Sequence, residues 1–104
     1  MPTLTTWGER SQFSYLGSVT QGTAITYGKG FSVTVSAGEY HALLTHFQGQ
    51  TVDIGTSHDN PPHGSVGEWL RMHVTKTGIA SYIGAILVSE GYARKAGGPR
   101  ITFL

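Results

Sequence analysis

Basic side chains gather near the end of this chain, around a Gly-Gly-Pro tip. Arg94 and Lys95 precede the tip and Arg100 follows it. Guanidinium and ammonium groups on a protruding turn bind phosphate or carboxylate groups through charge-assisted hydrogen bonds. Residues 65–104 carry a net charge of +3 and residues 1–64 a net charge of −2, so the total of +1 conceals an asymmetry. The sequence therefore predicts an electrostatic footprint for a polyanion in its C-terminal part.

The five histidines are the second group that could do chemistry. His41 and His46 are five positions apart, so on a helix they diverge by about 140° and do not form the i, i+4 pair that favours chelation. His58, Asp59 and His63 share one loop, and imidazole and carboxylate groups can bind zinc. Three ligands in a single loop, without groups to orient them, are a weak signal. We expect surface histidines and no metal site.

Most enzyme chemistries lack their residues here. The chain has no cysteine, which excludes disulfides, thiolate metal sites and a cysteine nucleophile. It contains no Gly-x-Ser-x-Gly elbow, no Walker phosphate loop and no dinucleotide fingerprint. We expect a protein that is not an enzyme and has no catalytic residues and no cofactor. A small metal-dependent hydrolase built on the loop histidines is the enzymatic alternative.

Length and composition fit one domain over residues 1–104. A chain of 104 residues with 38% hydrophobic residues can bury a single core. It has no apolar run of about 18 residues, as a membrane-spanning helix needs. Its first residues do not resemble a secretion signal. We expect a cytoplasmic protein that does not contact a membrane.

The first 35 residues favour strands. Residues 12–16, 24–27 and 31–35 alternate β-branched or aromatic residues with small or polar ones. Gly28 and Gly30 are expected to form the turn between the last two strands, because glycine adopts positive φ. This β-rich extension could extend a sheet, cover a sheet edge or make a homodimer contact.

Two helices are predicted from a repeated start signal. Serine is followed three residues later by glutamate at Ser36 and again at Ser65, which is the pattern of a capping box. Apolar residues then recur at helical spacing, which predicts helices over residues 37–48 and Val66–His73. The intervening chain is expected to form a short strand over residues 51–55 and then a loop.

A third helix is predicted to start from Thr77 as N-cap and to end at Gly91. Its apolar residues recur at spacings of three and four. Four of them are expected to pack in the core: Ile79, Ile83, Ile86 and Leu87. Tyr82 could lie at the edge of the core or contact a ligand. Residues 92–95 and 100–104 are predicted to form a hairpin around the glycine tip.

The predicted order over residues 36–104 is helix, strand, helix, helix and β-hairpin. That order resembles the winged helix-turn-helix family of DNA-binding domains, in which a second helix supports a recognition helix and the following hairpin forms a wing. The resemblance covers about two-thirds of the chain. It implies an α+β fold, in which a β-rich extension over residues 1–35 precedes a winged-helix-like core.

The resemblance also implies roles for particular residues. The start of a recognition helix faces the major groove, the wing contacts the backbone or the minor groove, and the supporting helix can hold a phosphate. The implied DNA-binding residues are Arg71, Lys76, Thr77, Ser81, Tyr82, Arg94, Lys95 and Arg100.

The predicted third helix lacks the side chains that a sequence-specific recognition helix normally uses. Residues 78–89 contain no Arg, Lys, Asn or Gln, the side chains that make bidentate contacts with bases. We therefore expect a regulator or accessory factor that binds duplex DNA through the wing and the start of the third helix, with the wing supplying most of the binding energy and with weak sequence preference. The alternative is a protein-interaction or structural module, such as a component of a phage or a larger complex, that reuses the fold for protein contacts.

Overall fold

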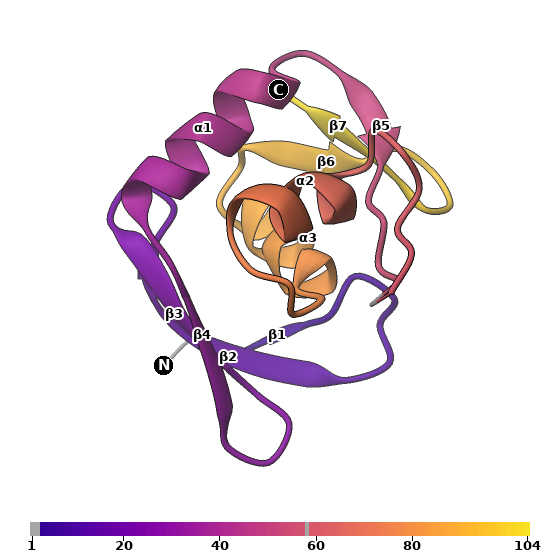
Figure 1. The fold of residues 1–104 in the computed structure, drawn as a ribbon. Helices are drawn as coiled ribbons and strands as arrows, with labels where there is room; N and C mark the ends of the chain where they lie inside the picture. The colour runs from indigo at the N-terminus through magenta and orange to yellow at the C-terminus, as the bar shows by residue number, and fades with distance from the viewer. Residues whose placement is uncertain (1–2, 58) are drawn as a thin grey trace.

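The computed structural model describes residues 3–57 and 59–104 and has an α+β architecture (Figure 1). Its elements in chain order are β1 (Thr3–Thr5), β2 (Gln12–Ser18), β3 (Gly22–Tyr27), β4 (Phe31–Val35), α1 (Ala37–Phe47), β5 (Thr51–Asp53), α2 (Val66–His73), α3 (Ala80–Ser89), β6 (Ala93–Lys95) and β7 (Arg100–Phe103). The predicted α+β class is confirmed, with four strands preceding the first helix.

The first sheet is an antiparallel meander in the order β1-β2-β3-β4. Side chains alternate along its strands, so that Phe13, Tyr15 and Ile25 are buried while their neighbours are half-buried or exposed. The three predicted strands are present, and Gly28 and Gly30 form the predicted turn with φ values of 57° and 91°. Strand β1 was not predicted, because three residues are too few to reveal an alternation.

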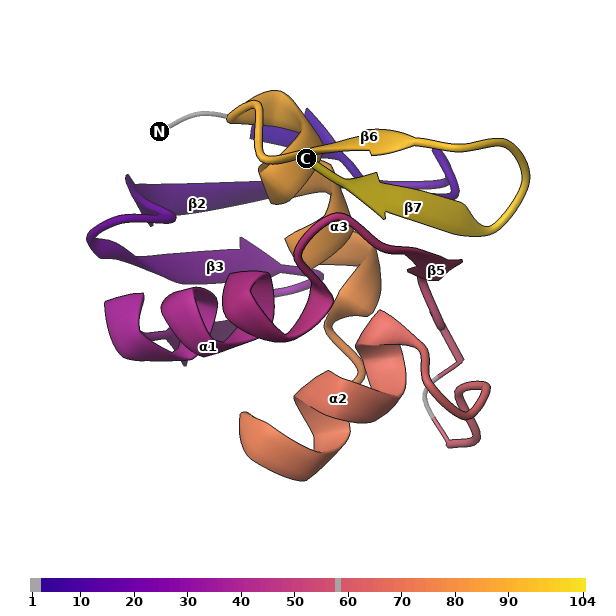
Figure 2. The ribbon, with the colours of Figure 1, turned by 90° about the horizontal axis from the view of Figure 1, so that it is seen from above.

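The second sheet has the strand order β5-β7-β6. It pairs the strand between α1 and α2 with the two strands that follow α3. Both neighbours of β7 are antiparallel to it, and Ile101 is opposite Val52 on one side and Lys95 on the other. Figures 1 and 2 show α3 lying between this sheet and the first one. The predicted strand over residues 51–55 and the predicted hairpin are confirmed, with slightly shorter strands.

The predicted capping box forms completely at Ser36 and by one of its two bonds at Ser65, where the Glu68 carboxylate accepts from the Gly64 amide instead. The Ser36 hydroxyl accepts from the Glu39 amide at 3.1 Å, and the Glu39 carboxylate accepts from the Ser36 amide at 2.9 Å. Ser65 likewise accepts from the Glu68 amide at 3.1 Å. These local bonds satisfy amides that a helix start leaves unpaired, so α1 and α2 begin where predicted.

The predicted start of α3 is wrong. The N-cap is Ile79, which provides no side-chain acceptor, and Thr77 lies in the preceding turn. There the Thr77 amide donates to the Thr75 hydroxyl at 3.3 Å, and the Ile79 carbonyl accepts from both the Tyr82 and Ile83 amides. Helix α3 ends as predicted, since Gly91, which follows its last turn, has a φ of 87°.

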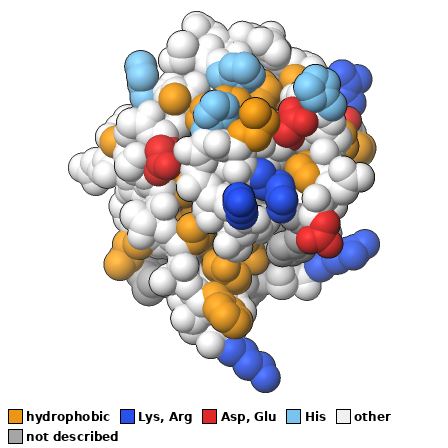
Figure 3. All heavy atoms as spheres, in the orientation of Figure 1, with side chains coloured by type: hydrophobic (Ala, Val, Ile, Leu, Met, Phe, Trp, Pro, Cys, Tyr) orange, Lys and Arg blue, Asp and Glu red, His pale blue; other side chains and the backbone are white. Residues whose placement is uncertain are grey.

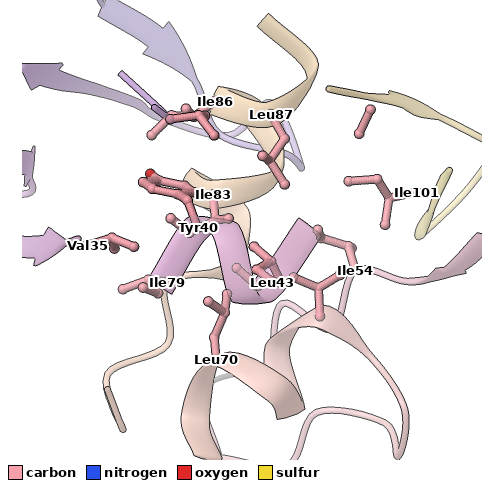
Figure 4. Close-up of a cluster of buried hydrophobic side chains, with 14 of the residues drawn as sticks. Val35, Tyr40, Leu43, Ile54, Leu70, Ile79, Ile83, Ile86, Leu87 and Ile101 are labelled. Carbon is pink, nitrogen blue, oxygen red and sulfur yellow. The ribbon is translucent and has the colours of Figure 1, made fainter. Parts of the chain in front are cut away.

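One hydrophobic core connects all of these elements. The labelled side chains of Figure 4 come from β4, α1, α2, α3 and its N-cap, β7 and the residue after β5, and Tyr40, Leu43 and Ile83 lie among them. Trp7, Phe13 and Tyr15 belong to the same cluster. Each such side chain stabilises the fold by about 1.5–3 kcal/mol. The N-terminal strands are therefore part of the core. In the described residues, no helix has the length and apolar character to cross a membrane.

Candidate nucleic-acid interface

Helix α3 is covered along one side by the N-terminal segment. The Trp7 amide donates to the Ser81 carbonyl at 3.0 Å. The Tyr82 ring stacks on Tyr27 at a centroid distance of 4.9 Å and meets the edge of Phe13 at 5.0 Å. Of the ten residues of α3, all of which the structure describes, Ser89 alone is exposed. This helix has no free face to insert into a major groove.

Glu90, just beyond α3, ties the helix to β2. Its carboxylate accepts from the Tyr15 hydroxyl at 2.8 Å and from the Val19 amide at 3.0 Å. Burial, followed by the hydrogen bond to Glu90, raises the pKa of Tyr15 to about 12. Burial also raises the pKa of Tyr82. The phenol groups of Tyr15 and Tyr82 therefore stay neutral at ordinary pH. Their contacts hold the N-terminal sheet on α3.

Lys95 contacts the N-terminal segment from the other side. Its ammonium group donates to the Trp7 carbonyl at 2.9 Å and lies 4.9 Å from the centroid of the Trp7 ring. A cation over an indole ring is attracted by the negative face of the ring. Lys95 is exposed, but its ammonium group is directed to an intramolecular contact that joins β6 to residue 7.

Arg94 and Arg100 are exposed on the hairpin formed by β6 and β7. The hairpin is short, since the Ala96 amide donates to the Arg100 carbonyl at 2.9 Å. Its tip is held in place, because the Pro99 carbonyl accepts from the Ile54 amide at 2.7 Å. Arg100 is opposite Asp53 in the sheet, so an acidic residue lies near one of the two guanidinium groups.

The α2–α3 connection presents the remaining predicted residues. Lys76 and Thr77 are exposed, and Arg71 donates to the Lys76 carbonyl at 3.2 Å. Arg71 therefore helps to hold the connection in place. On the face drawn in Figure 3, Lys and Arg side chains form separate small groups with other side chains between them. The predicted residues thus divide into exposed groups on two segments and groups engaged in internal contacts.

The histidines lie mainly at the surface. In Figure 3, several gather over the region of α1 and α2. His46 and His73 flank Trp69, at ring-centroid distances of 6.2 Å and 4.6 Å. His63 contacts the Glu68 carboxylate at 3.1 Å, and the hydrogen bond from the Gly64 amide, followed by that contact, lowers the pKa of Glu68. No group of three or more metal-ligating side chains occurs among the described residues, and His58 lies outside them.

The structure adds two residues that the sequence analysis left without a role, Trp7 and Arg10. Both lie in the segment over residues 6–11, which packs between α3 and β6 through the Ser81 and Lys95 contacts. This segment borders a hollow of about 410 Å³ at the first turn of α3. The sequence around Arg10, with Gly8 and Ser11, is typical of an exposed turn. No feature of that sequence predicts that the turn packs against α3.

Known proteins provide no template for this site. Neither protein families, nor curated proteins, nor solved structures yielded a match to the chain. A functional assignment therefore depends on the geometry of the chain itself. Exposed cations lie on the hairpin, in the α2–α3 connection at Lys76, in the segment over residues 6–11 at Arg10 and in the β3–β4 turn at Lys29.

Proposed function

We propose that residues 36–104 form the winged helix-turn-helix-like core of a single domain, and that this core binds the backbone of duplex DNA. The observation that carries this proposal is the second sheet, in which the strand after the first helix pairs with the hairpin that follows α3. This connection, with Arg94 and Arg100 exposed on the hairpin, supports a wing that contacts phosphates.

The proposed contact set is smaller than the one that the family resemblance implies. It consists of Arg94, Arg100 and Lys76, the exposed cations of the hairpin and of the α2–α3 connection other than Lys95. Guanidinium groups bind phosphate oxygens in a bidentate manner, and an ammonium group binds them as a point charge. Lys95, Ser81 and Tyr82 are left out because they contact the N-terminal part of the chain.

The mode of binding follows from the covered helix. Because α3 exposes only its last residue, base readout by that helix is excluded from the proposal. Binding through phosphates is nearly independent of sequence. An accessory DNA-binding factor fits this mode better than a regulator that recognises an operator sequence.

The experiment is a titration of labelled duplex at several salt concentrations between about 25 and 200 mM, followed by fluorescence anisotropy. Three phosphate contacts predict a slope of log K against log salt of about −2 to −3. Arg94→Gln or Arg100→Gln should each reduce the magnitude of the slope by about 1, for every sequence tested. Lys29→Gln is the control, since Lys29 lies in the β3–β4 turn far from the hairpin (Figure 1). Salt-independent binding, or none at low salt, would overturn the proposal.

A protein-interaction module is the second candidate, favoured by exposed apolar side chains. Leu16, Phe31, Met72 and Leu104 are between 54% and 70% exposed. Affinity capture from a nuclease-treated lysate separates the candidates. A partner that survives nuclease treatment and is lost with Phe31→Ser favours protein contacts, whereas material that disappears with the nucleic acid favours DNA. Sedimentation of the purified chain tests for a homodimer.

A further inference from the structure

A polar hollow of about 410 Å³ lies where the segment over residues 6–11 meets the first turn of α3. The side chains that give it its chemistry are those of Thr6, Arg10, Ser11, Thr56, Ser81 and Tyr82. Arg10 is the only charged residue among the lining residues that the structure describes, so no carboxylate opposes it there. The hollow is formed by three segments that are far apart in the sequence.

Thr6 supplies an unused hydroxyl. The residue is only 7% exposed, and its backbone is satisfied by bonds of 2.9 Å with Ser11 and Glu9. Its hydroxyl has no hydrogen-bond partner within the part of the chain that the structure describes. No buried side-chain oxygen of the described residues is left unpaired, so the Thr6 hydroxyl is in contact with solvent. Thr6 also borders a smaller hollow beside Lys95, but Arg10 and Ser81 line only the larger of the two.

The first turn of α3 adds backbone donors. Ile79 offers no side-chain cap, and its carbonyl accepts from the Tyr82 and Ile83 amides. The amides of Ala80 and Ser81 precede these and have no acceptor within the helix. The start of a helix carries a partial positive charge that favours anions. The bond between the Trp7 amide and the Ser81 carbonyl holds the segment over residues 6–11 against this turn.

We infer that this hollow binds a phosphate group. Its oxygens would accept from the Arg10 guanidinium, the Thr6 hydroxyl and the Ser81 amide in the first turn of α3. The same chemistry fits an internucleotide phosphate of DNA and a free phosphate or phosphate ester, and the volume leaves room for an attached group. The inference does not rest on the proposed DNA binding, because none of the hairpin residues lines the hollow.

Inorganic phosphate is the first probe, added at constant ionic strength while the backbone amides are followed by NMR. We expect saturable shifts centred on Thr6, Arg10 and Ser81. Arg10→Gln should raise the apparent Kd about tenfold or more, since a charged donor is lost. Thr6→Val, which keeps the shape of the side chain, should raise it about threefold. Arg94→Gln is the matched control and should leave the phosphate Kd unchanged, and the amide dispersion reports whether each variant is folded.

Duplex DNA is the second probe, added to the same samples. Shifts at Thr6 and Ser81 with both probes would identify a DNA phosphate as the ligand. Phosphate binding without DNA binding would leave a site for a free phosphate group, while the proposed function would fall. Phosphate shifts that do not saturate, or that are as large in Arg10→Gln, would overturn this inference. DNA binding that leaves Thr6 and Ser81 unmoved, with no saturable phosphate shift, would overturn it too and would leave the hairpin interface standing.

Discussion

The Trp7 ring lies against α3 at Gly84, where the absence of a side chain makes room for it. A Cβ at position 84 would lie 2.7 Å from Trp7 Cε3 and 2.7 Å from Ile54 Cδ1. Gly84 is thus the point at which the N-terminal segment and the end of β5 both reach the helix. The first sheet can cover α3 closely because this position has no Cβ.

We therefore expect Gly84→Ala to destabilise the protein, although alanine favours a helix by about 1 kcal/mol. Overpacking costs about 1–3 kcal/mol, and the two approaches of 2.7 Å place this site in the upper part of that range, at about 2–3 kcal/mol. The net loss of unfolding free energy should therefore reach about 1–2 kcal/mol. Gly38→Ala is the control, because a Cβ there would meet only Ser36 Oγ at 3.9 Å. It should stabilise the protein by about 0.4–1 kcal/mol. Urea unfolding measures both, and a Gly84→Ala protein as stable as the wild type would contradict the packing described.

Lys95 and Arg94 should respond to mutation in opposite ways. Lys95→Met keeps the aliphatic stem but loses the hydrogen bond to Trp7 and the cation–π contact, so unfolding should become about 1–2 kcal/mol easier. The salt slope of DNA binding should not change. Arg94→Met should alter stability by less than about 0.5 kcal/mol and should reduce the slope. In urea unfolding and anisotropy, a stable Lys95→Met protein with a reduced salt slope, together with a destabilised Arg94→Met protein with an unchanged slope, would contradict this prediction.

Tyr15 should make the free energy of unfolding depend on pH in the alkaline range. Its pKa is raised from 10.0 to about 12 by burial and by Glu90, so folding favours the neutral phenol. The resulting stabilisation is complete below pH 10 and is lost as the pH rises towards 12. Burial also raises the pKa of Tyr40, whose hydroxyl pairs with Thr23 at 2.7 Å.

Phenolate absorbance and unfolding free energy should be measured together across this range. We expect these tyrosines to ionise late, with loss of the fold. Tyr15→Phe should cost about 1 kcal/mol at neutral pH and should make the alkaline decline shallower. An unchanged decline in Tyr15→Phe would exclude Tyr15 as its cause.

Removal of residues 1–35 should prevent folding of the remainder. The deletion takes away Trp7, Phe13 and Tyr15, which share one core with α3. We expect residues 36–104 alone to lose cooperative unfolding and to bind a hydrophobic dye. Leu16→Ser in the full chain is the control, since Leu16 is exposed and the variant should fold normally. A well-dispersed amide spectrum from the truncated chain would contradict this and would favour an independent winged-helix core.

The sequence predicted best the elements that depend on local bonds. Helices α1 and α2 begin at capping serines, and the β3–β4 turn forms at glycines with positive φ. The start of α3 could not be predicted in this way, because Ile79 has no capping side chain. Its position depends on tertiary packing, which apolar spacing does not reveal.

The site was harder to predict than the fold, since its contacts join distant parts of the chain. Lys95 and Trp7 are 88 positions apart, so nothing near Lys95 indicates that its charge is used internally. The hollow beside Arg10 likewise combines residues 6–11 with Thr56 and Ser81. Sequence spacing identified Arg94 and Arg100 on the hairpin, but it could not show which cations remain available to a ligand.

The contacts from Tyr15 to Glu90 and from Trp7 to Lys95 also bear on how the chain is made. They span 75 and 88 positions, and they seal the apolar side of the first sheet against α3. On the ribosome, that sheet can pair its strands early but must wait, with its apolar side uncovered, until residues 80–95 have emerged. A translational pause in this interval would leave an incomplete chain exposed to aggregation or to chaperones.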